Sequence, residues 1–287
     1  MSVAPSPNAE HIEFWTDVLF EPFLRFRSMF VTMGDAHSRG PLDRLGLKAG
    51  DRVLDVGCGF GETTLQIAER VRPGGSALGT DCSEPFLQIA RNDAAAAGLD
   101  NAKFAAVDAQ TAAFEPEFDV AFARFGTMFF QNPTAGMRNV GSALKPGGRL
   151  LMIVWRPLQT NASMSFAKEI VERHIPPPPD EAPNCGPGPF SMADPAVVET
   201  ILRIAGYVDI AFEQTDVLAR IGSSVDEAMA FQLAIGPAAA IFREGGELAT
   251  EKRPVIEAEI REVLHRHQRE DGVYMATSSW AVTARRD

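Results

Sequence analysis

Cysteine is scarce in this chain, and long apolar runs are missing. Of its 287 residues only three are cysteines, Cys58, Cys82 and Cys185, and no two of them form a CxxC pair. Neither a disulfide framework nor a zinc knuckle is therefore predicted, and no metal site is expected. No stretch approaches the roughly eighteen apolar residues that a helix needs to cross a bilayer, so no membrane span is expected.

An excess of basic residues is missing as well. The formal net charge is -11 and the isoelectric point is near 5.0, which removes long-range attraction to a polyphosphate backbone but is compatible with a local basic patch. Nucleic acid is therefore not an expected partner. The first ten residues, MSVAPSPNAE, have neither a basic start nor an apolar stretch, and together with the cysteine usage they predict a cytoplasmic location.

Strand and helix patterns alternate through the middle of the chain. Between Asp51 and Trp155, short apolar runs alternate with amphipathic stretches. The strands expected from these runs are residues 52–57, 77–81, 102–108, 118–125 and 147–155. This alternation predicts right-handed crossovers and a parallel sheet covered on both faces, which is an α/β, Rossmann-like fold.

The rest of the chain is predicted to complete this core. We expect a helical N-terminal cap in residues 1–46, where apolar residues recur at helical spacing, and the core itself in residues 47–157. Residues 158–194 are rich in Pro and Gly, which predicts a loop or lid around one short helix. Residues 195–287 are expected to complete the sheet, with a helical insertion at about residues 223–270.

A helix start signal marks the boundary between the last two parts. Asp194 and Pro195 have the residue types of an N-cap and of a first helical position. Residues 207–219 and 273–286 each have the pattern of a strand, and two helical segments are expected between them.

The strongest motif is VLDVGCGFG, residues 53–61. An apolar strand containing Asp55 runs into Gly57, Gly59 and Gly61, and a helical pattern follows directly. Glycine lets the backbone turn sharply and approach a ligand with no Cβ in the way, and the following helix presents unpaired N–H groups. Alone, such a turn is also compatible with a tight connection; in this context it predicts a concave site for a nucleotide-like cofactor.

Two carboxylates are expected at the same edge of the sheet. Asp81 ends the next strand, about twenty residues after the glycines, where a carboxylate can accept hydrogen bonds from both ribose hydroxyls. Asp108 ends the third strand, at the edge where ligands of doubly wound folds bind. One such acid is compatible with a helix cap, whereas two acids beside a glycine loop favour a ligand site.

The same turn discriminates between cofactors. A dinucleotide fingerprint requires Gly or Ala where Glu62 stands, and the Gly-Lys-Ser/Thr of a P-loop does not occur in the sequence. An acidic residue at the exit of the loop also repels a pyrophosphate. An adenosyl ligand without phosphates is therefore favoured over NAD.

In this order, VLDVGCGFG, Asp81, the Asp108-Ala109 pair, FDVAFARF and LKPGGRLLMIVW resemble the successive motifs of class I S-adenosylmethionine-dependent methyltransferases. The resemblance covers about residues 50–155, and the last two predicted strands show it more weakly. It implies a seven-stranded, mostly parallel sheet with an antiparallel last strand, and S-adenosylmethionine as cofactor. Its closest general form is that of small-molecule enzymes of quinone biosynthesis and natural-product pathways, which implies a small-molecule acceptor.

The resemblance also implies contacts to the adenosine. Asp81 would bind the ribose hydroxyls, and Cys82 would flank the adenine. Asp108 would accept from the adenine amino group, and Ala109 would donate its backbone N–H to the ring. Asp55 would orient the glycine loop or receive the methionyl ammonium through water.

For the other half of the cofactor, the resemblance places Gly57, Cys58 and Gly59 against the methionine and ribose portion. Arg124 and Phe125 would lie beside the methionyl end. Methyl transfer from a sulfonium is an in-line displacement, so alignment and exclusion of water can supply much of the acceleration and a catalytic base is optional. We assign no base; His37 is the best placed histidine, and a surface or structural role is favoured for it.

The acceptor pocket is expected between the N-terminal cap, the GTMFF segment after the fourth strand, and the lid. The candidate lining residues are Phe14, Trp15, Phe26, Phe30, Met33, Phe190 and Met192. Aromatic and Met stripes of this kind are also typical of ordinary core. Where they line the pocket, they predict an apolar or aromatic substrate.

Other functions on the same fold stay open. A nucleic-acid base methyltransferase of the amino-directed kind carries an Asn/Asp-Pro-Pro-aromatic signature after the fourth strand, where this chain has residues 123–126 as Ala-Arg-Phe-Gly. A protein methyltransferase and a noncatalytic cofactor-binding module are further alternatives. The oligomeric state does not follow from the sequence.

Overall fold

The computed structural model describes residues 8–177 and 186–287. Within them the chain forms one sheet of eight strands in the order β3-β2-β1-β4-β5-β8-β6, and β7 pairs only with β8. The strands are β1 Arg52–Val56, β2 Ser76–Asp81, β3 Ala102–Ala106, β4 Phe118–Arg124, β5 Leu144–Trp155, β6 Tyr207–Gly222, β7 Gln268–Arg269 and β8 Gly272–Arg286. Parts of the predicted N-terminal cap and of the Pro-rich loop, with Cys185, lie outside the described residues.

The sheet has the predicted mixed direction. Strands β1 to β5 pair in parallel, whereas β8 is antiparallel to both β5 and β6. The prediction of a mostly parallel Rossmann-like sheet with an antiparallel last strand is therefore confirmed. The short β7 is one strand more than the seven expected, because the chain pairs with itself again in the turn before β8.

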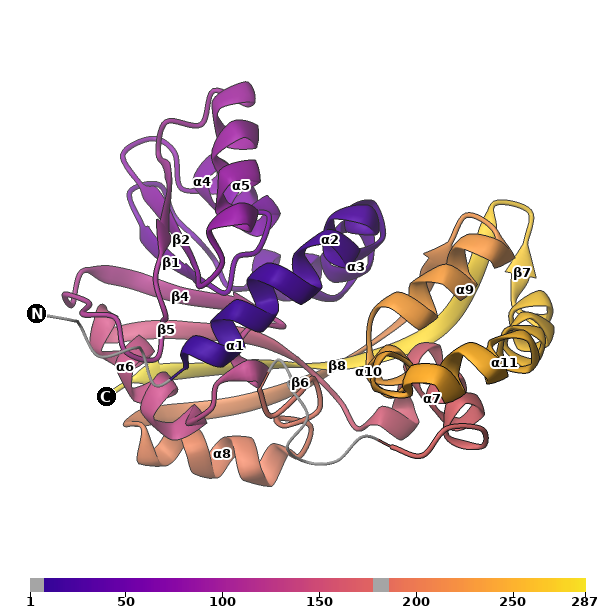
Figure 1. Cartoon of the computed structure of the whole chain (residues 1–287). Coiled ribbons are helices and arrows are strands. Elements are labelled where there is room, and N and C mark those ends of the chain that lie inside the picture. Colours follow the sequence, from indigo (N-terminus) through magenta and orange to yellow (C-terminus); the bar gives the residue numbers. More distant parts are fainter. Residues whose placement is uncertain (1–7, 178–185) are drawn as a thin grey trace, which may run out of the picture.

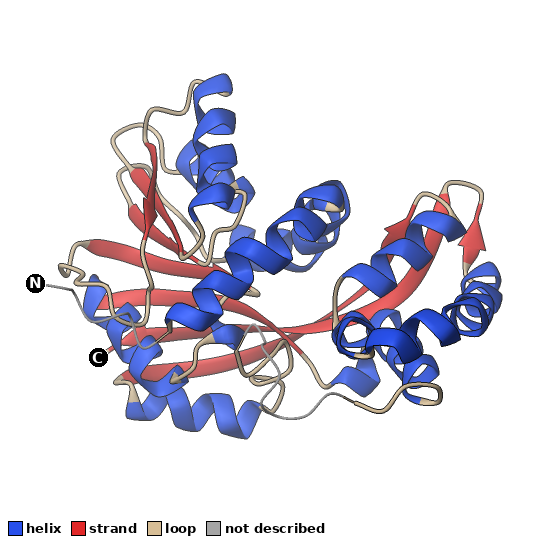
Figure 2. Ribbon diagram, in the orientation of Figure 1, coloured by secondary structure: helices blue, strands red, loops and turns tan. Residues whose placement is uncertain are grey.

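Helices cover both faces of the sheet and extend beyond it (Figure 2). Before the sheet lie α1 Ala9–Glu13, the π-helix η1 Phe14–Leu19, α2 Phe20–Arg25 and α3 Arg27–Arg44. Between the strands lie α4 Glu62–Arg70, α5 Glu84–Ala96, η2 Thr127–Phe129, α6 Pro133–Ala143, η3 Leu158–Thr160, α7 Ala162–Glu172, α8 Pro195–Ile204, α9 Val225–Ala234, α10 Pro237–Glu244 and α11 Gly246–Arg266.

Alternating side chains of the strands fill two cores. In β4, Ala121 and Ala123 belong to the core on one face, and Val120 and Phe122 belong to the core on the other. Successive residues of a strand point to opposite faces, so a strand that is apolar throughout is buried on both sides. This explains why the predicted strands of the middle segment are continuous apolar runs.

A second mass of helices lies at the far end of β6 and β8. These two strands have 16 and 15 residues, and Figure 1 shows them curving past the sheet to carry α7, α9, α10 and α11 away from α4 and α5. We call this part the lobe. It has its own apolar core, which includes Ile170, Phe231, Ile256 and Ile260. The N-terminal helices lie between the sheet and the lobe (Figure 1).

The helix signals of the C-terminal part are borne out in part. The Asp194 carboxylate accepts a hydrogen bond from the Ala196 N–H at 2.9 Å, so α8 has the predicted cap. The insertion predicted at about 223–270 contains α10 in addition to the two expected helical segments, because Gly236 with φ +95° ends α9 and Pro237 begins a new helix.

In the part of the chain that the structure describes, no single helix combines the length and the apolar character that crossing a membrane requires. The bent pair α9 and α10, which meet at 66°, meets that test only when both helices are counted together.

Candidate active site

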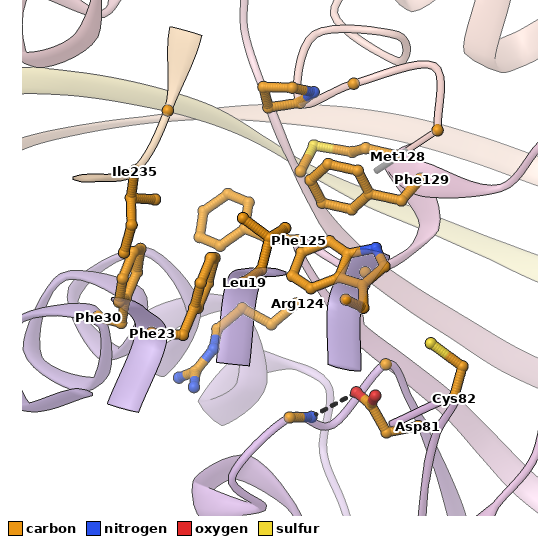
Figure 3. Close-up of a pocket in the computed structure, with 18 of the residues that line it drawn as sticks. Leu19, Phe23, Phe30, Asp81, Cys82, Arg124, Phe125, Met128, Phe129 and Ile235 are labelled. Carbon is orange, nitrogen blue, oxygen red and sulfur yellow. Dashed lines mark hydrogen bonds between the residues drawn. The ribbon is translucent and has the colours of Figure 1, made fainter. Parts of the chain in front are cut away.

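Most of the residues predicted to contact a cofactor surround one cavity. It has a volume of about 690 Å³ and follows the ends of β1, β2 and β4. The predicted residues that line it are Gly57, Cys58, Gly59, Asp81, Cys82, Asp108, Ala109, Arg124 and Phe125. In Figure 3, Asp81 and Cys82 lie at one end of the cavity and Ile235 lies toward the other.

The glycine loop needs its glycines for two different reasons. Gly57, Gly59 and Gly61 have φ values of +67°, +54° and +81°, which side-chain-bearing residues rarely adopt. A Cβ on Gly57 would also lie 3.0 Å from the Cα of Gly126, the residue that follows β4 and its Phe125. Gly126 was not predicted as a site residue, because its importance comes from this close backbone contact, which no pattern in the sequence indicates.

Asp55 lies behind this loop and does not line the cavity. Its Oδ2 accepts hydrogen bonds from the hydroxyls of Thr63 at 2.8 Å and Thr64 at 2.6 Å, which lie in the first turn of α4. Burial raises the pKa of Asp55 to about 6, although the two hydroxyls oppose this shift. These contacts support the first of its two predicted roles, orientation of the loop, over contact with an ammonium group.

Asp81 is held by the loop and by the helix that follows it. Its Oδ2 accepts from the Gly59 N–H at 2.9 Å, and its Oδ1 accepts from the Ser83 N–H at 3.0 Å. Burial raises the pKa of Asp81, and the bonds from these two N–H groups oppose the increase. Each carboxylate oxygen has more than one lone pair, so both can still accept from a ligand in the cavity.

The third strand was predicted to end at Asp108, but β3 ends at Ala106, where its pairing with β2 stops. Asp108 therefore lies in the turn, two residues after the strand. Its carboxylate accepts from the Asn8 side chain at 2.5 Å and from the Gln110 N–H at 2.9 Å. The N-terminal segment thus reaches this end of the cavity. No local pattern in the sequence predicts this contact between Asn8 and Asp108.

Arg124 ends β4, Phe125 follows it, and both residues line the cavity. Phe125 has φ +58°, a conformation rare for a bulky residue, and its ring stacks on Trp155 at 3.9 Å between centroids. The Arg124 side chain passes Gly34 of α3, where a Cβ would lie 2.9 Å from its Nε. Burial lowers the pKa of Arg124, and the carboxylates of Glu62 and Asp55 oppose that change.

His37 is a structural residue. Its two ring nitrogens lie 2.8 Å from the hydroxyls of Ser279 and Thr277, so the ring connects α3 to β8. It is fully buried and outside the cavity lining, and burial lowers its pKa to about 4. The ring is therefore neutral at neutral pH, in agreement with the structural role favoured from the sequence.

Beyond the loop, the cavity widens into an apolar chamber. Phe23 and Phe30 stack at 4.4 Å between ring centroids, and Trp15 meets Phe129 edge to face at 4.9 Å. Figure 3 shows Leu19 and the Phe23 and Phe30 rings on one side of this chamber. The predicted lining residues found there are Phe14, Trp15, Phe30, Met33 and Phe190, together with Met128, Phe129 and Phe130 of the GTMFF segment.

Two predicted lining residues are wrong. Phe26 is 3% exposed and packs edge to face on Phe231 at 5.5 Å within the core of the lobe. Met192 is 1% exposed and belongs to the core of the sheet. Phe231 and Ile235 of the lobe line the chamber instead, and the sequence does not indicate that α9 returns to the cofactor edge.

The fold, the glycine loop and the carboxylates after β2 and β3 define an α/β protein of the class I methyltransferase type. Residues 47–206, more than half of the chain, match the model of a family described as a methyltransferase domain. The chain belongs to this family. The predicted fold, the enzyme class and S-adenosylmethionine as cofactor are thereby confirmed at the level of the family.

Curated relatives are similar to parts of the chain. The ubiquinone/menaquinone biosynthesis C-methyltransferase of Pseudomonas fluorescens is 33% identical over 131 residues, which cover 45% of this chain and 51% of the relative. Nocamycin O-methyltransferase of Saccharothrix syringae is 31% identical over 186 residues, which cover 60% of this chain and 65% of the relative. The chain thus spans about half to two thirds of the length of these relatives.

Among solved structures, the YcgJ protein of Bacillus subtilis has a similar fold. Its TM-score is 0.56 at 16% identity, and the match covers 87% of this chain and 98% of YcgJ. At this identity the similarity extends to the fold alone.

Proposed function

We propose that this protein transfers the methyl group of S-adenosylmethionine to a small, largely apolar or aromatic acceptor. One observation carries the proposal. The cavity has a glycine loop, Asp81 and Asp108 at one end, and it continues into a chamber of aromatic side chains. A polar adenosine and an apolar acceptor can occupy these two parts side by side, which is the arrangement that a direct transfer requires.

In this proposal the adenosine lies along the ends of β2 and β3. The Asp81 carboxylate accepts from the ribose hydroxyls, and Cys82 flanks the adenine. Asp108 accepts from the adenine amino group, with Asn8 sharing the same carboxylate. The N–H of Ala109 bonds no residue in the described chain, which leaves it to donate to the ring.

The methionyl part lies between the loop and β4. Gly57, Cys58 and Gly59 leave room for it, and Phe125 lies beside it. Arg124 forms no ion pair within the described residues, and its nearest hydrogen-bond partner is the Ser38 hydroxyl at 3.5 Å. A guanidinium without a carboxylate partner fits the carboxylate of the methionyl group.

The residues of this chain mainly align the acceptor with the methyl group and exclude water from the reaction. The cofactor supplies an activated methyl group on a sulfonium, and displacement at that carbon needs an acceptor atom held in line with it. The aromatic walls exclude water from this line. No catalytic base is assigned.

In this proposal, different segments of the chain have different functions. Residues 47–157 hold the cofactor, residues 1–46 cover it, and residues 158–194 with the helical insertion at about 223–270 supply the remaining walls of the acceptor chamber. Residues from all four parts line the cavity, which supports this division. We further propose a cytoplasmic location; the free thiols of Cys58 and Cys82 suit a reducing compartment.

Turnover of labelled cofactor tests the function. The protein is incubated with S-adenosylmethionine and a set of phenols, quinols and amines, because the curated relatives named above include both a C- and an O-methyltransferase. Mass spectrometry then follows the formation of S-adenosylhomocysteine and of a methylated product. Calorimetry on the same protein compares S-adenosylhomocysteine with NAD, and tighter binding of NAD would refute the cofactor assignment.

A further inference from the structure

Two polar side chains that line the cavity have atoms without a hydrogen-bond partner. Ser163 of α7 is 2% exposed and Gln232 of α9 is 3% exposed, and both residues line the cavity. Within the described residues, the Ser163 Oγ and the Gln232 Nε2 are buried and bond no other group. Buried polar atoms without partners cost free energy and are rare in native proteins, so each of these atoms calls for an explanation.

Both atoms are carried by helices of the lobe. Helices α7 and α9 belong to the lobe, at the opposite end of the molecule from α4 and α5 (Figure 1). Ile235, which directly follows α9, lies across the chamber from Asp81 and Cys82 in Figure 3. The other buried side-chain atoms that lack partners in the described chain belong to Asp55 and Arg156, which do not line the cavity.

The charged groups near this end are already paired. Lys168 forms an ion pair with Glu172, and the Arg243 Nε lies 3.5 Å from the Glu244 carboxylate. An anionic ligand would therefore compete with an existing carboxylate for either cation. A neutral oxygen, in contrast, can accept from an amide N–H or a hydroxyl that has no other partner.

We propose that Ser163 and Gln232 donate hydrogen bonds to a neutral carbonyl or hydroxyl oxygen on the part of the methyl acceptor that lies toward the lobe. This inference rests on the proposed function and specifies its substrate class. The acceptor is an apolar or aromatic skeleton that packs against the wall formed by rings such as Phe30 and Phe231, which meet edge to face at 5.4 Å between centroids, and it carries an oxygen at its far end. A pocket built to bond such an oxygen rejects an analogue in which carbon replaces it.

A pair of probes with the same shape tests this. 2-Acetylnaphthalene and 2-isopropenylnaphthalene differ in one position, where the first has a carbonyl oxygen and the second a methylene carbon. Calorimetry measures the affinity of each with saturating S-adenosylhomocysteine. We expect the ketone to bind about tenfold more tightly to the wild-type protein, and the double variant Ser163→Ala, Gln232→Met to reduce this preference to about twofold or less.

Ser165→Ala is the matched control, because Ser165 lies on the same helix and does not line the cavity. It should keep the preference. Equal affinity of the wild-type protein for the two probes overturns the inference without any variant. A double variant that melts at a higher temperature and keeps the preference also overturns it, because the two atoms then bind only water.

Failure of the proposed function gives a different result. If S-adenosylhomocysteine does not bind the wild-type protein, the cofactor assignment fails, whereas the comparison of the two probes can still be made without cofactor. Loss of the preference in the double variant with unchanged affinity for S-adenosylhomocysteine supports the inference on its own.

Discussion

At the scale of single residues, Asp81 has two tasks that a substitution can separate. Its carboxylate bonds the Gly59 and Ser83 N–H groups and is proposed to bind the ribose. Asp81→Asn keeps the shape but replaces one acceptor oxygen by a donor. We expect affinity for S-adenosylhomocysteine, measured by calorimetry, to fall by about 1–3 kcal/mol.

Asp100→Asn controls for the general effect of removing an acidic residue. Its side chain is 94% exposed, and it pairs only with Arg72 on the surface. The control should bind the cofactor product like the wild-type protein. An Asp81→Asn protein that is folded and has unchanged affinity would contradict the role of Asp81.

Gly34 tests the position of Arg124. A Cβ at Gly34 would lie 2.9 Å from the Arg124 Nε and 3.0 Å from its Cζ, so Gly34→Ala forces the guanidinium to move. Alanine also raises helix propensity by about 1 kcal/mol, which offsets the strain in α3. We therefore expect little change in the free energy of unfolding and about tenfold weaker binding of S-adenosylhomocysteine, equal to about 1.4 kcal/mol.

Gly40→Ala is the control on the same helix. Its Cβ would meet only the Nη1 of Arg44, at 3.2 Å, and this long side chain can turn away. The Gly40 variant should gain stability and keep its affinity. Equal affinity in both variants would show that the position of Arg124 does not matter for the cofactor.

His37 predicts a pH dependence of stability. Its pKa is lowered from 6.5 to about 4 by burial, so between these values the unfolded chain binds a proton that the folded chain does not. Acidification across this range therefore favours unfolding, by about 3 kcal/mol for this group. Asp55, with its pKa raised to about 6, acts in the opposite direction.

The His37→Gln variant should lose this part of the pH dependence, because glutamine does not titrate. Urea unfolding at a series of pH values between 4 and 7 measures the slope of the free energy of unfolding. His265→Gln, on the exposed face of α11, should leave the slope as it is. A His37→Gln slope equal to that of the wild-type protein would mean that folding does not change the pKa of His37.

At the scale of helices and strands, the sheet was predictable because its signals are local. Each strand from β1 to β5 is an apolar run, and the glycine loop with Asp81 marks the carboxyl edge. The lining of the chamber was predicted only in part, since it depends on helix phase. The π-helix Phe14–Leu19 changes the phase of the side chains, and Phe26 stands at the break between α2 and α3, so helical spacing in the sequence does not determine which way Phe26 faces.

The contacts across elements were beyond the sequence for the same reason. Asn8 meets Asp108 across 100 residues, and Phe231 reaches the chamber only because β6 and β8 carry the lobe back toward the N-terminal helices. Periodicity describes one element at a time. It does not determine which distant elements share a cavity.

The N-terminal helices are attached to the cofactor edge by Arg27. Its Nε lies 2.8 Å from Glu62 of α4, and its Nη2 lies 2.5 Å from Asp93 of α5. Arg27→Met should loosen α1, η1 and α2 by about 1 kcal/mol, which is roughly fivefold faster amide exchange in residues 9–25. Hydrogen exchange followed by mass spectrometry measures this.

Arg203→Met removes an ion pair of similar length within α8, where Arg203 bonds Glu199 four residues away. It should leave exchange in residues 9–25 unchanged. If both variants exchange at the wild-type rate there, the helices are held by their other contacts, such as that of Asn8 with Asp108 and that of Phe20 with Phe86 at 5.2 Å.

At the scale of the whole molecule, the two long strands β6 and β8 join the sheet and the lobe. The strands pair along almost their full length, from Tyr207–Arg286 at one end to Gly222–Val273 at the other. The lobe core and the sheet core therefore share the same pair of strands. Unfolding of one part removes the support of the other, so we expect a single cooperative transition.

Cofactor binding should raise the melting temperature of that single transition. A ligand that binds only the folded chain at one hundred times its dissociation constant stabilises it by about 2.7 kcal/mol, which shifts the melting temperature of a chain of this size by about 4–5 °C. Scanning calorimetry with S-adenosylhomocysteine measures the shift, and NAD at the same concentration should leave the temperature unchanged. Two separate transitions, of which only one moves, would show that the lobe folds independently of the cofactor edge. The acceptor chamber between them would then be assembled by docking of two units, in place of the continuous strands that we infer support it.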